Sequence, residues 1–425
     1  MRRGAPPSPT RKNCGFLSPT PDTSCPPESF LAAKRPTILQ IIPGLDTGGA
    51  ELSTIEIAEA IERAGGRAIV LSEGGRLVQR LRDTGAELQF FPAAAKNPVR
   101  LWWNSRRIAQ VVHRDGVDLI HARSRAPAWS AMMAARRTGL PFVTTYHGAY
   151  NERSPLKRLY NGVMARGDVV IANSQYTADL IRMRYGTPLD RLRVIYRGVD
   201  DRWFDPAKVA AQRVTALRKE WGVKPGARVI LNAARLTRWK GQNVLIEAVR
   251  LLREGGRLRS GVLVLAGDAQ GRGGYQRQLE QEVQKGGVAE QVRIVGHVDD
   301  MPAAFLAAHL AVVASIEPEA FGRTAAEAQM MGTPVIATDI GAPPETVLSA
   351  SRVGAGEATG WLVPPNDAER LAEALATALT LTPEARTAMG ARAHAHVARS
   401  FSLEGMKQQT LKVYDALLST HMAAG

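Results

Sequence analysis

Short apolar segments alternate with helical segments along this chain, and the alternation restarts once, after residue 225. In the first half we expect strands at residues 37–42, 67–71, 88–91, 117–121, 142–145, 168–172 and 193–196. In the second half we expect them at residues 229–236, 261–268, 292–295, 310–314, 335–338 and 360–363. Apolar strands separated by helices are typical of a parallel sheet covered on both faces. The sequence therefore predicts an α/β protein with two Rossmann-like parallel-sheet domains facing each other across a cleft.

The length of 425 residues agrees with two domains, because a single hydrophobic core rarely serves so long a chain. We expect residues 1–35 to be a disordered, Pro-rich basic tail and residues 36–205 to form the first domain. Residues 206–402 would form the second domain. An amphipathic helix at residues 403–425 would then pack back on the first domain.

Composition excludes several classes of protein. No apolar run approaches the roughly 18 residues that span a bilayer, and the charged start of the chain lacks the apolar core of a signal peptide. Cys14 and Cys25 both lie in the tail, which favours a reducing, cytoplasmic setting without disulfides. The net charge is +15, of which the first 200 residues carry +12, so an anionic partner is expected there. Nucleic acid is disfavoured because no zinc-ligand spacing or RNA-binding aromatic motif is present.

Two basic helices are expected at residues 99–114 and 154–166. The first carries Trp102 and Trp103 among its arginines, and the second carries Lys157 and Arg158. Such helices either lie on an anionic membrane surface or pack one face while water covers the other. The sequence leaves both alternatives open, so peripheral association with the inner face of the cytoplasmic membrane remains an expectation.

Candidate ligand-binding residues follow the strands, because ligands bind beyond the carboxyl ends of strands in parallel sheets. His147 comes directly after the strand at 142–145, where an imidazole can donate to a substrate hydroxyl or transfer a proton. Gly48 and Gly49 follow the first strand and either form a turn or let a ligand approach the backbone. For His147, a structural role and a functional role are equally compatible with its position.

The second half places two cations after its first strand. Arg235 and Lys240 lie five residues apart and would hold a diphosphate, Arg as a fork and Lys as a point charge. Gly267 ends the next strand. Gly296 and Val298 follow the third, where main-chain groups can contact a flat base.

Residues 317–335, EPEAFGRTAAEAQMMGTPV, contain an acidic loop, a turn at Gly322 and a helix expected at 324–331. Glu319 lies in the loop and Glu327 one turn inside the helix. The free N–H groups of such a helix start suit a phosphate. Acidic residues there can also serve only to complement the helix dipole. The cations and His147 at other strand ends favour a ligand site.

Taken in order, the segments GGAE, TYHG, RGVD, RLTRWKG, AGD and EAFGRTAAE resemble family 4 of the retaining glycosyltransferases, which have the GT-B fold. The resemblance spans about residues 37–418. The segment EAFGRTAAEAQ is similar to the corresponding motif of bacterial enzymes of lipopolysaccharide-core or related surface-polysaccharide synthesis.

This resemblance implies a hexosyltransferase with an acceptor-side first domain and a second domain that binds a nucleotide-diphosphate-sugar donor. The acceptor would be a glycan or a lipid-linked glycan, and no metal or other cofactor is expected. By resemblance, Arg235 and Lys240 bind the donor diphosphate, Glu327 the ribose and Glu319 the sugar, which His147 contacts near the reacting carbon. The catalytic set is His147, Glu319, Arg235 and Lys240. The donor-binding set is Gly48, Gly49, Gly267, Gly296, Val298, Phe321, Gly322, Arg323 and Glu327.

Arg323 and Thr324 stand where many members of that family have an apolar residue and a proline. Two rival functions are a nucleotide-sugar epimerase with the same fold and a non-catalytic adaptor that kept the fold. An epimerase would need more acidic and histidine groups in the cleft, and an adaptor would be expected to lose a cation or a glutamate. The sequence retains all of them, which favours the transferase.

Overall fold

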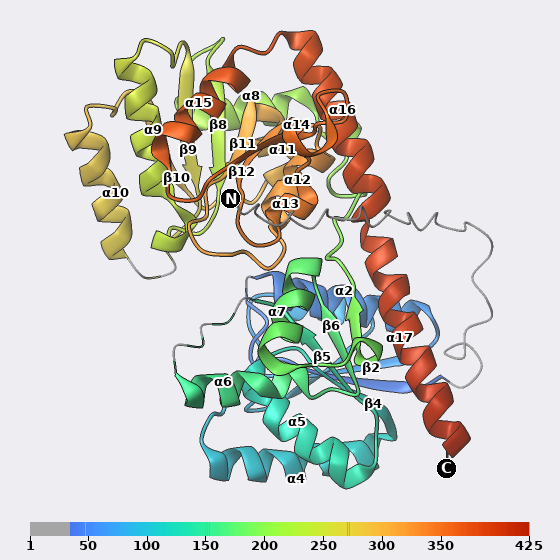
Figure 1. Ribbon diagram of the computed structural model, residues 1–425. Helices are drawn as coiled ribbons and strands as arrows, with labels where there is room; N and C mark the ends of the chain where they lie inside the picture. The colour runs from blue at the N-terminus through green and yellow to red at the C-terminus, as the bar shows by residue number, and fades with distance from the viewer. Residues whose placement is uncertain are drawn as a thin grey trace, which may run out of the picture.

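The computed structural model describes residues 35–46, 48–148, 150, 152, 154–269, 271 and 273–424. The predicted tail, apart from residue 35, and both cysteines lie outside the described residues. Figure 1 shows two α/β domains, one above the other, with α16 (Pro383–Ser400) and α17 (Leu403–Ala424) running along one side.

The first domain contains a seven-stranded parallel sheet in the order β3-β2-β1-β4-β5-β6-β7. Its strands are β1 Thr37–Ile41, β2 Arg67–Ser72, β3 Glu87–Phe90, β4 Val117–Ala122, β5 Phe142–Tyr146, β6 Val169–Ala172 and β7 Leu192–Val194. Its helices are α2 Gly49–Arg63, α3 Val78–Arg82, α4 Pro98–Asp115, α5 Arg125–Thr138, α6 Pro155–Asn161 and α7 Gln175–Tyr185. Strands β1, β5 and β6 are buried along their whole length, as expected for a sheet covered on both faces.

The second domain contains a six-stranded parallel sheet in the order β10-β9-β8-β11-β12-β13. Its strands are β8 Arg228–Ala233, β9 Gly261–Ala266, β10 Val292–Gly296, β11 Leu310–Val313, β12 Val335–Thr338 and β13 Gly360–Val363. Its helices are α8 Ala211–Glu220, α9 Gln242–Glu254, α10 Gly273–Lys285, α11 Met301–Ala307, α12 Arg323–Met330, α13 Pro343–Thr346, α14 Ala350–Val353 and α15 Ala368–Leu379. The predicted fold class, two Rossmann-like parallel-sheet domains, is confirmed.

The strand order reverses direction at one point in each sheet. In the first domain this switch lies between β1 and β4, and in the second between β8 and β11. Crevices that open at such points, beyond the carboxyl ends of the strands, are the usual ligand sites of these sheets. The fold therefore offers two equivalent positions for a site, one for each domain.

Several predicted strands extend past their observed carboxyl ends, including the first two of the second domain. The apolar run expected at 229–236 leaves the sheet after Ala233, and the one expected at 261–268 leaves it after Ala266. Leu236 stays buried outside the sheet, and its N–H donates to the carbonyl oxygen of Asp268 at 3.0 Å. Burial without sheet pairing explains the error, because apolar sequence alone does not distinguish the two.

The C-terminal helix α17 packs against α2 of the first domain. Lys407 of α17 forms an ion pair with Glu59 at 2.6 Å, and the Tyr414 hydroxyl lies 2.6 Å from Nδ1 of buried His121 on β4. No described helix combines the length and apolar character that crossing a membrane requires.

The two domains also contact each other through polar groups. The carboxylate of Glu345, on α13, accepts hydrogen bonds from the backbone N–H groups of Gln175 and Tyr176 at 2.8 and 2.7 Å. These N–H groups belong to the first turn of α7, so a carboxylate of one domain caps a helix of the other.

Candidate active site

Helix α12 starts at the switch point of the second sheet. Gly322 precedes it with φ of +83°, a left-handed conformation that favours glycine. The hydroxyl of Thr324 donates to the carbonyl oxygen of Ala233, the last residue of β8, at 3.2 Å. The start of α12 and the carboxyl end of β8, which leads into the loop that carries Lys240, are therefore joined by a hydrogen bond.

Lys240 and Glu319 form an ion pair at this point, with Nζ and Oε1 separated by 2.6 Å. Only 14% of the Lys240 side chain and 10% of the Glu319 side chain are exposed. The hydroxyl of Ser315 donates to the same carboxylate oxygen, and the Lys240 ammonium lies 4.2 Å from the centre of the Trp239 ring. The cation predicted for the diphosphate and the acid predicted for the sugar are thus direct neighbours.

Arg235 lies in the same loop and is exposed. Its carbonyl oxygen accepts a hydrogen bond from the side chain of Gln242, at the start of α9, which holds the loop against that helix. The exposed Arg235 side chain lies at the β8 end, on the same loop as the ion-paired Lys240.

The remaining predicted donor residues lie at neighbouring strand ends. Gly267 follows β9, and its N–H donates to the carbonyl oxygen of Gly296, at the end of β10, at 2.6 Å. Val298 is half-buried against the apolar core. Phe321 is buried among Tyr196 and Phe401, with ring centres 6.3 and 5.6 Å away. A donor contact at Phe321 would therefore come from its backbone.

Arg323 bridges the two domains. Its Nη2 lies 2.7 Å from Oε1 of Glu56 on α2, and its Nε lies 3.2 Å from Oε1 of Glu327, one turn further along α12. Nη2 also donates to the carbonyl oxygen of Gly198 at 3.3 Å. Arg323, which departs from the usual motif of the resembled family, thus connects Glu327, the predicted ribose-binding residue, to the first domain.

Burial raises the pKa of Glu327 to about 7, although the neighbouring Arg323 opposes this shift. Glu56 adds to the increase because it is a second carboxylate nearby. Glu327 therefore changes its charge near neutral pH, where a hydrogen bond from a ribose hydroxyl would favour the ionised form.

His147 follows β5 and accepts a hydrogen bond on Nδ1 from Nη2 of Arg197 at 2.8 Å. Its Nε2 is buried and has no hydrogen-bond partner among the described residues. Burial, and then the charge of Arg197, hold the pKa of His147 well below its usual range. The imidazole is therefore neutral with its proton on Nε2, and it can donate one hydrogen bond to a substrate.

Arg197 explains the glycine that follows β1. A Cβ atom built on Gly49 would lie only 1.7 Å from Nη1 of Arg197. Gly49 is thus needed to admit this guanidinium, which neither of the two alternatives raised from the sequence had anticipated. At the adjacent Gly48, the carboxylate of Glu51 occupies the corresponding space. Burial, followed by the charge of Arg323, lowers the pKa of Arg197 to about 10.

The structure therefore brings together Lys240 with Glu319 and Arg323 with Glu327, and it orients His147 through Arg197. Arg197, Glu56 and Ser315 are parts of the site that sequence reasoning missed. The RGVD segment contributed to the family resemblance, but Arg197 was given no role, although an arginine directly beyond a strand end is a usable signal. Among the described residues, no three His, Cys, Asp or Glu side chains are grouped as ligands of a metal ion.

Comparison with known proteins agrees with this geometry. Residues 47–203 match the model of Glycosyltransferase Family 4, and residues 214–396 match that of Glycosyl transferases group 1. A D-inositol 3-phosphate glycosyltransferase of Xylanimonas cellulosilytica is 32% identical over 321 residues, which cover 70% of this chain and 71% of that protein.

Solved structures are similar over most of the chain. A glycosyltransferase from Rickettsia africae is 33% identical, with a TM-score of 0.82 over 91% of this chain and 99% of the other. Anabaena Alr3699/HepE, solved in complex with UDP, is 25% identical with a TM-score of 0.77 over 89% of this chain and 100% of the other. WaaG, a glycosyltransferase of lipopolysaccharide biosynthesis, shares the fold at 17% identity, with a TM-score of 0.67 over 88% and 99%.

Two facing parallel-sheet domains with these relatives define a glycosyltransferase of the GT-B fold. The chain belongs to glycosyltransferase family 4.

Proposed function

We propose that this glycosyltransferase moves a hexosyl group, with retention of configuration, from a nucleotide-diphosphate-sugar to a glycan or lipid-linked acceptor. The process it serves would be synthesis of a bacterial cell-envelope polysaccharide such as lipopolysaccharide. The observation that carries the proposal is the pair of Lys240 and Glu319 beside the start of α12, at the switch point between β8 and β11. The UDP and UDP-glucose complexes of HepE support a nucleotide-sugar donor.

Charge on the leaving group determines the mechanism that we propose. The bond between the anomeric carbon and the diphosphate oxygen breaks, and negative charge grows on the diphosphate. Arg235, Lys240 and the N–H groups at the start of α12 stabilise that charge from fixed positions. Because these groups supply the positive charge, we expect a chelator to leave turnover unchanged.

Glu319 binds the hydroxyls of the donor sugar in this proposal, and Glu327 binds those of the ribose. The Nε2–H group of His147 donates a hydrogen bond to the sugar near the reacting carbon, because Nε2 has no partner among the described residues. The acceptor oxygen attacks on the face that the diphosphate leaves, and its proton passes to a diphosphate oxygen. No protein side chain is then needed as nucleophile or general base.

The names of the relatives favour a second acceptor class. WaaG is named for lipopolysaccharide biosynthesis, but it resembles this chain in fold alone. The more similar sequence relatives are named D-inositol 3-phosphate glycosyltransferases. A phosphorylated polyol is therefore a candidate acceptor beside the envelope glycan.

Association with the cytoplasmic face of a membrane is part of the proposal. Helix α4 exposes Val99 and Trp103, and α6 exposes Leu156 and Leu159, all by more than half of their surface. Apolar side chains among arginines suit the surface of an anionic bilayer. In Figure 1, α4 lies at the end of the first domain farthest from the second domain.

A screen of nucleotide-sugars tests the donor assignment. Each compound is assayed for thermal stabilisation of the protein and for slow release of its nucleoside diphosphate, because a ligand of the native state raises the melting temperature by mass action. We expect one base and sugar combination to act in both assays. If no nucleotide-sugar stabilised the protein or was hydrolysed, the proposed function would be wrong.

A further inference from the structure

A cavity of about 680 Å³ lies at the switch point of the first sheet, the counterpart of the place where Lys240 meets Glu319. Pro43, two residues beyond β1, and Ser124, two residues beyond β4, lie on its wall. Its volume is that of a site for a small molecule, which is roughly 300–1,000 Å³.

Three cationic side chains line this cavity, and they come from three separate segments. Lys96 precedes α4, Arg125 is the first residue of α5, and Lys157 lies in the first turn of α6. None of the three forms an ion pair with a carboxylate among the residues that the structure describes. Like charges that converge on one hollow without internal compensation raise the local concentration of an anion.

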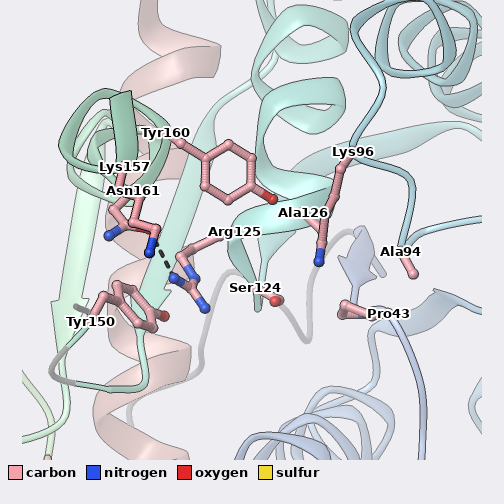
Figure 2. A pocket seen from close by; sticks show the side chains of 10 residues that line it. All are labelled: Pro43, Ala94, Lys96, Ser124, Arg125, Ala126, Tyr150, Lys157, Tyr160 and Asn161. Atoms are coloured by element: carbon pink, nitrogen blue, oxygen red, sulfur yellow. Dashed lines mark hydrogen bonds between the residues drawn. The ribbon is translucent and has the colours of Figure 1, made fainter. Parts of the chain in front are cut away.

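Arg125 is held in place before any ligand arrives. Its Nη1 donates to Oδ1 of Asn161 at 2.8 Å, and its guanidinium carbon lies 4.0 Å from the centre of the Tyr150 ring. A fixed planar fork binds a phosphate or carboxylate with little loss of side-chain freedom. Figure 2 shows Lys96 and Tyr160 directed toward the middle of the cavity, with Arg125 beside Tyr150.

The start of α5 adds to the positive potential. This helix has 14 residues, and its first residues, with Ser124 before them, form part of the cavity wall. The Ser124 side chain makes no capping hydrogen bond, so its hydroxyl is not bonded to the first N–H groups of the helix. Both kinds of group can donate to an anion in the cavity.

We propose that this cavity binds the acceptor, and that the acceptor carries a phosphomonoester on a polyhydroxylated ring. Lys96, Arg125 and Lys157 hold the phosphate, while Tyr160 and the Ser124 hydroxyl contact the ring. Tyr150 follows His147 by three residues, so the bound ring lies on the approach to the proposed reaction centre. This assignment rests on the proposed transferase function, and it deepens that function by naming the class of acceptor.

Titration calorimetry of the full chain tests the assignment. The probes are inositol 3-phosphate and glucose 6-phosphate, with inositol and glucose as uncharged counterparts. We expect the phosphorylated probes to bind and the uncharged ones to bind at least tenfold more weakly, as for charge-assisted hydrogen bonds in general. Equal affinity for the phosphorylated and uncharged probes would overturn the proposal.

The double variant Lys96→Ala with Lys157→Ala keeps Arg125 and its packing and so preserves the fold. We expect its affinity for the phosphorylated probes to fall on the order of tenfold for each cation removed. The matched control is Lys219→Ala with Lys285→Ala, two exposed lysines of the second domain, which we expect to bind as the natural chain does. Unchanged binding by the Lys96 and Lys157 variant would refute the assignment.

The phosphate can belong to a free molecule or to a lipid headgroup, and a vesicle arm distinguishes these sources. Phosphatidylcholine vesicles with and without phosphatidic acid are co-sedimented with the natural chain and the Lys96 and Lys157 variant. Retention that requires both phosphatidic acid and the two lysines identifies a lipid headgroup, and soluble binding alone identifies a free acceptor. Absence of lysine-dependent binding in both arms would contradict the proposal.

Binding of UDP, ADP and GDP by the same two proteins separates this inference from the proposed function. We expect nucleoside diphosphate binding to be equal in the natural chain and the Lys96 and Lys157 variant. If phosphate probes failed while a nucleoside diphosphate bound, only the acceptor assignment would fall. If no nucleoside diphosphate bound the natural chain, the donor assignment would fall by itself.

Discussion

The two sheets carry equivalent switch points, but the charges at these points are arranged differently. In the second sheet, Lys240 is paired with Glu319, and next to it Arg323 is paired with Glu327 and Glu56. In the first sheet, Lys96, Arg125 and Lys157 surround a cavity without a described carboxylate partner. A ligand at the donor-side point must compete with internal ion pairs, whereas an anion at the acceptor-side point displaces none. The same fold thus holds one compensated and one uncompensated anion site.

The largest effect is expected at the switch point of the second sheet, where Lys240 is paired with Glu319. Replacement of Lys240 with Ala removes fixed positive charge from the leaving diphosphate, and we expect turnover to fall on the order of 10²- to 10³-fold. The measurement is kcat at saturating donor and acceptor, with Lys285→Ala as control. The Lys96 and Lys157 variant should instead raise KM for the acceptor, so a change in kcat alone there would break the contrast between the two points.

A pH effect is expected from Glu327. Its pKa of about 7 in the fold exceeds the ordinary value of 4.5, so the unfolded chain loses this proton first as pH rises. The stability contributed by this group is therefore lost between about pH 4.5 and about pH 7. The difference between the two pKa values sets an upper limit on this loss of stability. Because 17% of the Glu327 side chain is exposed, solvent screens the effect, and we expect the loss to be about 2 kcal/mol.

Denaturation of the natural chain and of Glu327→Gln at several pH values measures this loss. The substitution should raise the free energy of unfolding above pH 7, relative to the natural chain, and should change it little near pH 4.5. Glu369→Gln, at an exposed position in the first turn of α15, serves as control. An identical pH profile for the natural chain and Glu327→Gln would show that Glu327 ionises normally in the fold.

The pair of Arg323 and Glu56 should couple the two domains. Arg323→Leu leaves the buried Glu56 carboxylate without its ion-pair partner, and we expect it to lower the free energy of unfolding by about 2 kcal/mol. Glu56→Leu leaves Arg323 paired with Glu327, and we expect it to lower the free energy of unfolding by less. The double variant should recover part of this loss, because neither charge then remains buried alone. Strict additivity of the two single effects in a double-mutant cycle would refute direct coupling.

The smallest effect concerns the exposed apolar residues of the first domain. We expect Trp103→Ala with Leu156→Ala to reduce sedimentation with phosphatidylglycerol vesicles by a few-fold, since each side chain buries little area at an interface. Trp203→Ala with Met422→Ala, also exposed apolar residues, provides the control. Salt-insensitive binding, or equal binding by both double variants, would refute membrane binding through these residues of the first domain.

Local signals in the sequence predicted most of the fold. The strands β12 and β13 begin and end at the predicted residues, and the helix expected from residue 154 starts there, where the Ser154 hydroxyl accepts from the N–H of Lys157. Periodicity and capping depend on neighbouring residues, which is why such features are readable. The convergence of Lys240 and Glu319, 79 residues apart, was predicted only as membership of one site.

Tertiary contacts account for what the sequence did not reveal. Arg197 lies against Gly49 and His147, and nothing near it in the chain indicates these partners. Phe321 was included among the donor-binding residues because of its motif, but its ring is buried in the core. Lys157 was placed on a basic helix that could face either a membrane or water, and its place beside Lys96 and Arg125 depends on how three separate segments pack.

The central claim is that the donor diphosphate binds where Lys240 is paired with Glu319. It is tested by calorimetric binding of UDP, ADP and GDP to the natural chain, Lys240→Ala and Glu319→Gln. In Lys240→Ala, we expect about tenfold weaker binding of the nucleotide that the natural chain prefers, because a charge-assisted contact is lost. In Glu319→Gln, we expect about fivefold tighter binding of the same nucleotide, because the competing carboxylate is gone and the sugar that it would contact is absent. Unchanged binding by Lys240→Ala together with unchanged binding by Glu319→Gln would contradict the account.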